Sequence, residues 1–152
     1  AAGFATTDYF MPLQFVGRDG LTPERLWSKD GPRAYVGLAL PGFPNLFTPF
    51  GPNSQGRSGS FYSVAEMWAR YSLKAIVHVI ESGKTSIECR ESAYLRYNEA
   101  LDRESKKLLW ERYGKGFYYL TQEGRSVVNS PWSGPEYHDL LLQPKFEDFV
   151  VQ

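Results

Sequence analysis

The stretch Pro41–Gly83, PGFPNLFTPFGPNSQGRSGSFYSVAEMWARYSLKAIVHVIESG, decides how this chain folds. Its apolar run Asn45–Phe50 lies between Pro44 and the pair Gly51-Pro52, which predicts a short buried strand. The segment Gly51–Gly59 contains three glycines, so its backbone can turn sharply and approach a ligand closely. A strand and a glycine-rich turn are therefore expected here, followed by a helix.

Apolar side chains recur at helical spacing after this turn, which predicts one long amphipathic helix over residues 60–82. The stripe consists of Phe61, Val64, Ala65, Trp68, Ser72, Ala75, Ile76, Val79 and Ile80. The spacing of Ser63 and Glu66 is typical of a capping box, and Gly83 is placed to end the helix. Backbone N–H groups and the positive end of the helix dipole would meet at the turn, which favours an anion or an electron-rich ring edge.

One interpretation of the turn is a phosphate-binding loop. Gly51–Ser58 differs at one position from the motif G-x-x-x-x-G-K-[ST], because Arg57 stands where the motif has lysine. A lysine acts as a point charge between phosphates, whereas the arginine side chain is a planar fork. No later apolar strand is expected to end in an aspartate that could hold magnesium. A P-loop-type nucleotide-binding protein is therefore an alternative that depends on the near-match alone.

A longer ordered series of motifs gives a second interpretation. The segment Gly31–Ser54, GPRAYVGLALPGFPNLFTPFGPNS, resembles the C-terminal part of the Baeyer–Villiger flavoprotein monooxygenases. Other motifs resemble the 4-hydroxyacetophenone monooxygenase branch of that family, namely Gly59-Ser60, Ile87-Glu88-Cys89-Arg90, Tyr97-Asn98, Leu101-Asp102, Trp110, Gly124-Arg125 and Asn129-Ser130-Pro131-Trp132. The resemblance runs from Ala1 to about Pro144, which is nearly the whole chain.

The resemblance implies an α/β flavoprotein with two dinucleotide-binding domains, of which this chain is the C-terminal part, α+β in class as a fragment. Residues 1–83 would complete the FAD-binding domain, and residues 84–152 would form a C-terminal helix and a β-rich flap. Ala1–Phe4 resembles the Ala-Thr-Gly-Phe that ends a strand beside the flavin in this family, with Ala2 in place of the threonine. The G-x-G-x-x-G turns expected for FAD and NADPH do not occur in the sequence, so we expect the chain alone to be inactive.

The activity implied by the resemblance is that of an FAD-dependent, NADPH-using monooxygenase, which inserts one oxygen of O2 into a ketone to give an ester. The residues implied to contact the cofactor are Ala2, Gly3, Phe4, Gly51, Pro52, Asn53 and Ser54, and those implied to border the substrate are Gly56, Arg57, Ser58 and Trp132. No catalytic residue is assigned, because the arginine that serves the family's chemistry would lie outside these 152 residues. A stand-alone binding or assembly module without catalysis is the other alternative.

Shorter elements are expected around the central unit. Strands are expected at Ala34–Leu40 and Thr85–Arg90, the second of them at a sheet edge. A charged helix is expected over Glu91–Tyr113, and a β-rich flap over residues 115–144. The tail Pro144–Gln152 gives no clear signal.

Composition limits the class of protein. A hydrophobic content of 42% and an aromatic content of 16% argue against disorder. The 17 basic and 17 acidic residues cancel, so no net field would attract nucleic acid or an anionic membrane. The single Cys89 suits a reducing compartment, so a cytoplasmic protein is expected, and with His78 and His138 it shows no metal-ligand spacing. The expected partners are a ketone, O2 and the rest of the chain's own polypeptide, with no membrane.

Overall fold

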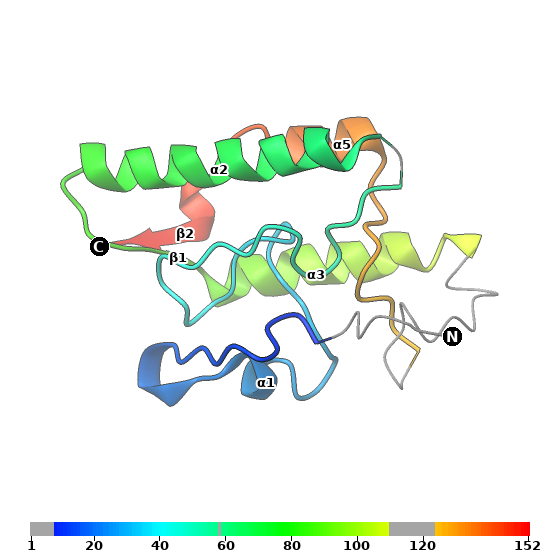
Figure 1. The fold of residues 1–152 in the computed structure, drawn as a ribbon, viewed down its shortest axis with the longest axis horizontal. Helices are drawn as coiled ribbons and strands as arrows, with labels where there is room; N and C mark the ends of the chain where they lie inside the picture. The colour runs from blue at the N-terminus through cyan, green and yellow to red at the C-terminus, as the bar shows by residue number, and fades with distance from the viewer. Residues whose placement is uncertain (1–7, 58, 110–123) are drawn as a thin grey trace.

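The computed structural model describes residues 8–57, 59–109 and 124–152. Within these ranges the longer helices are α2 (Phe61–Glu81), α3 (Glu91–Ser105) and α5 (Gly134–Leu141). The shorter elements are η1 (Arg18–Gly20), α1 (Pro23–Leu26), β1 (Ile87–Cys89), η2 (Phe146–Asp148) and β2 (Phe149–Val151). Helices α2 and α5 lie side by side in one layer, α3 runs beneath them, and α1 is at the bottom of the view (Figure 1). The arrangement is the α+β class that the sequence predicts for a fragment.

Helix α2 confirms the predicted long helix but begins at a different cap. The Oγ of Ser60 accepts a hydrogen bond from the Tyr62 N–H at 3.2 Å, so Ser60 rather than Ser63 is the N-cap. Gly83 follows the helix with a φ of 65°, as expected for a glycine that ends it.

The buried face of α2 is narrower than the predicted stripe. Its buried side chains are Val64, Trp68, Tyr71, Ala75 and Val79, whereas Phe61, Ile76 and Ile80 are exposed. The buried positions follow one line along the helix, and this line faces α5 and β1. Periodicity alone does not show how wide the covered face is.

The segment from Ala34 to Ser54 is largely buried but irregular, so both strands predicted in it are wrong. Only isolated bridges occur at these positions among the described residues, pairing Tyr35 with Ala39 and Ala39 with Phe47. Val36, Asn45 and Phe50 have φ angles of 47°, 60° and 60°, in the left-handed region that interrupts a strand. The prolines and glycines around the apolar runs therefore turn the chain instead of bounding strands.

Strand β1 confirms the predicted strand near residues 85–90. It pairs antiparallel with β2, with Ile87 opposite Val151 and Cys89 opposite Phe149. On its other edge Asn45 replaces a neighbouring strand, because its N–H donates to Ile87 O at 2.9 Å and its Oδ1 accepts from Ile87 N at 3.0 Å. The tail, which gave no signal in the sequence, thus supplies half of this small sheet.

The C-terminal part departs most from the expected β-rich flap. Helix α3 confirms the first part of the helix predicted over Glu91–Tyr113. Residues 134–141 are helical rather than extended, since Ser133 and Glu136 form a complete capping box at the start of α5. Residues 110–123, which carry the end of that predicted helix and the first part of the predicted flap, lie outside the described residues.

One cluster of buried side chains joins α2, α3, α5, β1 and β2. Two of its buried polar groups are paired with each other, because Trp68 Nε1 donates to the Tyr137 hydroxyl at 3.0 Å and that hydroxyl donates to Val36 O at 3.3 Å. The cluster draws side chains from both sides of Gly83. Within the described ranges, no helix has the length and apolar character needed to cross a membrane.

Candidate functional site

The predicted site centres on the turn Gly51–Ser54, whose four residues are all buried. The Ser54 hydroxyl donates to Gly51 O at 2.6 Å and closes the turn. A Cβ added at Gly51 would lie 2.5 Å from Gly37 O and 2.6 Å from the Thr48 Oγ1. Glycine is therefore needed at position 51 by the fold of the chain itself, whether or not a ligand lies against it.

Asn53 ties the turn to the extended residues 126–129. Its N–H donates to Val127 O at 2.8 Å, and its Nδ2 donates to Ser126 O at 2.9 Å and to Asn129 O at 3.0 Å. Further along the loop, the N–H of Gln55 donates to Val128 O at 3.1 Å. A phosphate-binding loop turns such N–H groups towards its ligand. Since these are already paired within the chain, the geometry disfavours the phosphate-binding interpretation.

A small pocket of about 180 Å³ opens between the turn and the start of α2. Its walls are formed by Phe50, Ser54, Gln55, Gly56, Gly59, Ser60, Phe61, Val64 and Trp68. The Phe50 ring lies 5.5 Å from the Phe61 ring and 5.8 Å from the Trp68 ring, centre to centre. Such a surface can pack against a planar ring or an apolar substrate.

Two of the predicted site residues line this pocket, whereas its aromatic lining was not predicted. Ser54 and Gly56 were predicted as site residues, whereas Phe50, Phe61 and Trp68 were read only as strand and helix core. A signal was present, because Phe61 and Trp68 are seven residues apart on one helix face directly after the glycine-rich turn. The volume of this pocket is below the roughly 300 Å³ at which ligand pockets usually begin.

Arg57 and Trp132, both predicted beside the substrate, are brought together by the structure. The exposed Arg57 donates from Nε to Trp132 O at 3.3 Å, and the half-buried Trp132 donates from Nε1 to the Tyr97 hydroxyl at 3.1 Å. Neither side chain lines the 180 Å³ pocket. The other predicted site residues Ala2, Gly3, Phe4 and Ser58 lie outside the described residues.

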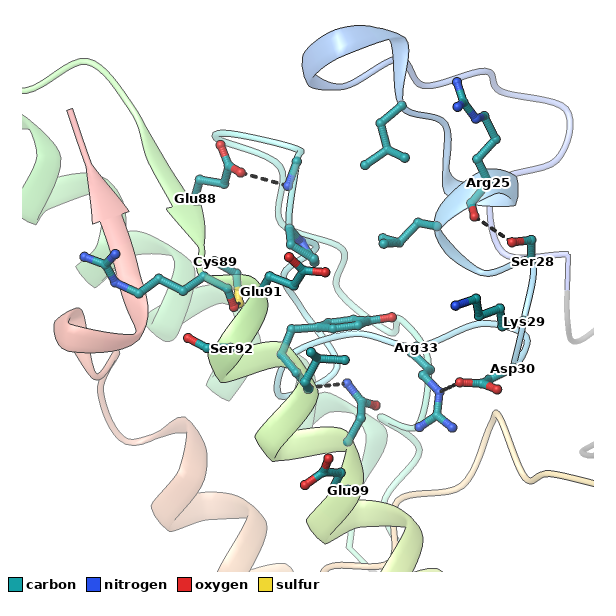
Figure 2. A pocket seen from close by; sticks show the side chains of 18 of the residues that line it. Arg25, Ser28, Lys29, Asp30, Arg33, Glu88, Cys89, Glu91, Ser92 and Glu99 are labelled. Carbon is teal, nitrogen blue, oxygen red and sulfur yellow. Dashed lines mark hydrogen bonds and ion pairs between the residues drawn. The ribbon is translucent and has the colours of Figure 1, made fainter.

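A larger cleft of about 970 Å³ lies between α1 and α3, away from the predicted site (Figure 2). Arg25, Lys29 and Arg33 line one side of it, and Glu88, Glu91 and Glu99 line the other. None of the predicted site residues that the structure describes belongs to its walls. Because the opposite charges face one another, the cleft has no strong field of a single sign.

The chemistry available in this cleft is limited. Burial raises the pKa of the Cys89 thiol to about 12, with a further contribution from Asp148, so the thiol stays protonated and is a poor nucleophile near neutral pH. Across the described ranges, no group of His, Cys, Asp and Glu side chains is arranged to hold a metal ion. The described side chains of this cleft therefore supply neither an ionised thiol near neutral pH nor a set of metal ligands.

Comparisons with known proteins match the chain along its whole length, although no family model matches it. It is 33% identical over 150 residues to an uncharacterized monooxygenase of Sinorhizobium fredii, covering 98% of this chain and 23% of that protein. It is 32% identical over 146 residues to a Baeyer–Villiger monooxygenase of Pseudomonas aeruginosa, covering 95% of this chain and 27% of that protein. The chain thus spans about a quarter of the length of these two relatives.

Solved structures give the same result for the fold. A steroid monooxygenase bound to NADP superposes with a TM-score of 0.78 at 25% identity, covering 91% of this chain and 26% of that one. A cyclohexanone monooxygenase from Rhodococcus sp. Phi1 bound to NADP+ gives a TM-score of 0.80 at 18% identity, covering 94% and 27%. The chain has the fold of about one quarter of a Baeyer–Villiger monooxygenase, which confirms the fold class expected from the sequence.

Proposed function

We propose that these 152 residues are part of an FAD-dependent, NADPH-using Baeyer–Villiger monooxygenase, in which they form one wall of the flavin and substrate pocket. The observation that carries this proposal is the end-to-end match of the chain to about a quarter of such enzymes, in sequence and in fold. The motifs that follow one another along the sequence from Gly59-Ser60 to Pro131-Trp132 favour the 4-hydroxyacetophenone branch. Bound FAD would supply the oxygen-transfer chemistry that converts a ketone to an ester with one oxygen atom of O2.

The described residues fit a role in shaping and shielding such a site. Phe50, Phe61 and Trp68 offer an apolar surface, and an apolar wall excludes water from a reactive centre. Helix α2 has 21 residues, and the positive end of its dipole at Ser60 faces the same pocket, where it would favour an electron-rich ring edge.

The predicted contacts remain part of this proposal. They are flavin contacts by Ala2, Gly3, Phe4, Gly51, Pro52, Asn53 and Ser54, and substrate contacts by Gly56, Arg57, Ser58 and Trp132. Because Asn53 and Ser54 are buried and bonded within the chain, we propose that the turn acts through its backbone shape. No residue of this chain is assigned as a catalytic acid, base or nucleophile.

The outer face of α2 supports the proposal that the rest of a longer polypeptide packs on this chain. Leu73, Ile76, Val77 and Ile80 share one face of the helix and are all exposed. An apolar face of this kind usually marks an interaction surface. We therefore propose that the chain is inactive alone and that residues 1–83 and 84–152 are the two parts of the C-terminal region. The single cysteine, a free buried thiol, supports a cytoplasmic setting.

The test uses these 152 residues within a full-length chain of the relatives' size. We expect purified protein to retain about one FAD per chain, to oxidise NADPH when a ketone is added, and to place one ¹⁸O atom from ¹⁸O2 in the ester. Arg57→Ala should keep the flavin and change ketone preference or the fraction of NADPH oxidised without product. The matched control is Arg103→Ala, another exposed arginine, which lies on α3 away from the pocket.

Two outcomes would contradict the proposal. One is a well-folded full-length protein that neither retains nor rebinds FAD. The other is micromolar ATP binding that Arg57→Ala abolishes, which would restore the phosphate-loop interpretation.

A further inference from the structure

The side chain of Arg125 donates hydrogen bonds to three separate parts of the chain, and one of these parts is the turn of the predicted site. Its Nε donates to Asp102 Oδ1 of α3 at 3.2 Å, its Nη1 donates to Pro32 O at 2.9 Å, and its Nη2 donates to Asn53 Oδ1 at 3.0 Å. Its side chain is only 14% exposed. The guanidinium plane thus links a helix, the chain entering the irregular segment and the Gly51–Ser54 turn.

The bond to Asn53 completes the hydrogen bonding of that side chain. The Asn53 Nδ2 already donates to Ser126 O and Asn129 O, so the bond from Arg125 fixes the remaining end of the amide. Asn53 itself has a φ of 55°, a conformation that asparagine tolerates better than most residues. Its neighbour Ser54 lines the 180 Å³ pocket, so a rotation of the Asn53 amide would shift the position of Ser54 in the pocket wall.

The arrangement requires an arginine. A planar fork can donate to three acceptors lying in different directions, whereas lysine is a flexible point charge. Burial and the nearby Arg33 both lower the pKa of Arg125, and Asp102 opposes this shift. A guanidinium kept in such a place indicates that its geometry, and not merely its charge, matters there.

We propose that Arg125 is a positioning residue, which touches neither flavin nor ketone and holds the Gly51–Ser54 turn in place through Asn53. Its effect on ligand binding rests on the proposed function. The positioning of Asn53 does not, because it depends only on contacts within this chain.

Arg33 provides a matched control. Its Nη2 pairs with the other oxygen of Asp102 at 2.9 Å, and its side chain is also 14% exposed. Among the described residues, however, it makes no hydrogen bond to Asn53. Arg125→Lys and Arg33→Lys therefore disturb the same carboxylate at equal exposure, and only the first removes the fork that reaches the turn.

The first measurement is FAD binding by the full-length chain, from quenching of flavin fluorescence on rebinding to apoprotein. We expect Arg125→Lys to weaken FAD binding by about tenfold, the usual size for a lost charge-assisted hydrogen bond, and Arg33→Lys to change it less than about twofold. Asn53→Ala, which also removes the two bonds made by Nδ2, should weaken binding at least as much as Arg125→Lys does. The double variant should be no weaker than Asn53→Ala alone, because the linkage from Arg125 is already broken in that variant. Equal losses in the two lysine variants, or additive losses in the double variant, would overturn the proposal.

The second measurement separates this inference from the proposed function. In protein labelled with ¹⁵N at asparagine, the Asn53 side-chain amide resonance should shift in Arg125→Lys and not in Arg33→Lys, with or without FAD. A full-length parent that binds no FAD would refute the proposed function, while that shift would still support the positioning role. An unshifted Asn53 resonance in Arg125→Lys refutes the positioning role whatever the flavin content.

Discussion

The irregular segment of residues 34–54 and helix α2 differ in how burial relates to backbone regularity. Leu38 and Leu40 of the irregular segment are 0% exposed, whereas Ile76 and Ile80 of the regular helix are 47% and 69% exposed. A helix satisfies its own interior N–H and C=O groups, so it can lie at the surface with one face covered. The irregular segment pairs these groups in two ways, through tight turns such as that joining Tyr35 and Ala39 and through distant residues such as Glu88, whose Oε1 accepts from the Gly42 N–H. Each prediction below tests one side of this difference.

The largest effect on stability is expected at the turn Gly51–Ser54, which ends the irregular segment. Gly51→Val should lower the free energy of unfolding by about 3 kcal/mol, because the new side chain meets the Gly37 carbonyl and Thr48, which are held by the surrounding packing. Gly59→Val is the control, since its added Cβ meets nothing within 4 Å and only its φ of 93° opposes the change. Urea denaturation of both variants measures the difference. A loss below about 1 kcal/mol in Gly51→Val would show that crowding at Gly51 does not limit the fold.

A smaller loss of stability is expected when the Tyr137 hydroxyl, which links α2 to the irregular segment, is removed. Tyr137→Phe removes the group that accepts from Trp68 Nε1 of α2 and donates to Val36 O of the irregular segment. Leaving these buried groups without a partner should cost about 2 kcal/mol. Tyr62→Phe, at a ring that is 82% exposed, should leave the urea midpoint within error. A neutral Tyr137→Phe would mean that packing alone joins the two regions.

Adjacent residues of α2 sharpen the comparison within the helix. Val79→Ala should cost roughly 1–2 kcal/mol of stability, because Val79 is buried, whereas Ile80→Ala should change it by less than about 0.5 kcal/mol.

The 152-residue chain should bind a hydrophobic dye through the outer face of α2, and Leu73→Lys with Ile80→Lys should reduce that binding. A cooperative melt with no dye binding by the parent would contradict the exposure of this face.

The smallest effect concerns pH. Burial raises the pKa of Cys89 and of Tyr94 to about 12 each, above their ordinary values of 9.0 and 10.0. Below the ordinary values both groups are protonated in the folded and the unfolded chain. Above them the unfolded chain releases protons first, so stability falls as pH rises from about 9 towards 12. We expect these two groups to lower the free energy of unfolding by about 1 kcal/mol between about pH 8 and about pH 9.5, and Cys89→Ala to remove most of that loss. Rapid reaction of the folded chain with a thiol reagent at pH 8 would contradict the raised pKa of Cys89.

The sequence predicted what depends on neighbours along the chain. Helix α2 and the start of α3 follow from helical periodicity, and the glycines and Pro52 located the turn of the candidate site. Strand β2 and the irregular segment were not predictable in this way, because Asn45 and β2 acquire their roles from β1, which is distant in sequence. Arg125 was missed as a positioning residue for the same reason. Helix α5 was predictable in principle from Ser133 and Glu136, but the expectation of a flap outweighed that local signal.

The pairing of β1 with β2 also sets an order of events during synthesis. Residues 149–152 leave the ribosome after everything else in the described chain, and Gln152 O receives the N–H groups of Thr85 and Ser86. Helix α2 can form as soon as it emerges, since its hydrogen bonds are local. The sheet can form only after residues 149–151 have been synthesised. Until then one edge of β1 can pair with Asn45, and its other edge has no partner strand. Until residues 149–152 pair with β1, the nascent chain therefore carries an unpaired strand edge and an apolar helix face at the same time, a combination that favours aggregation.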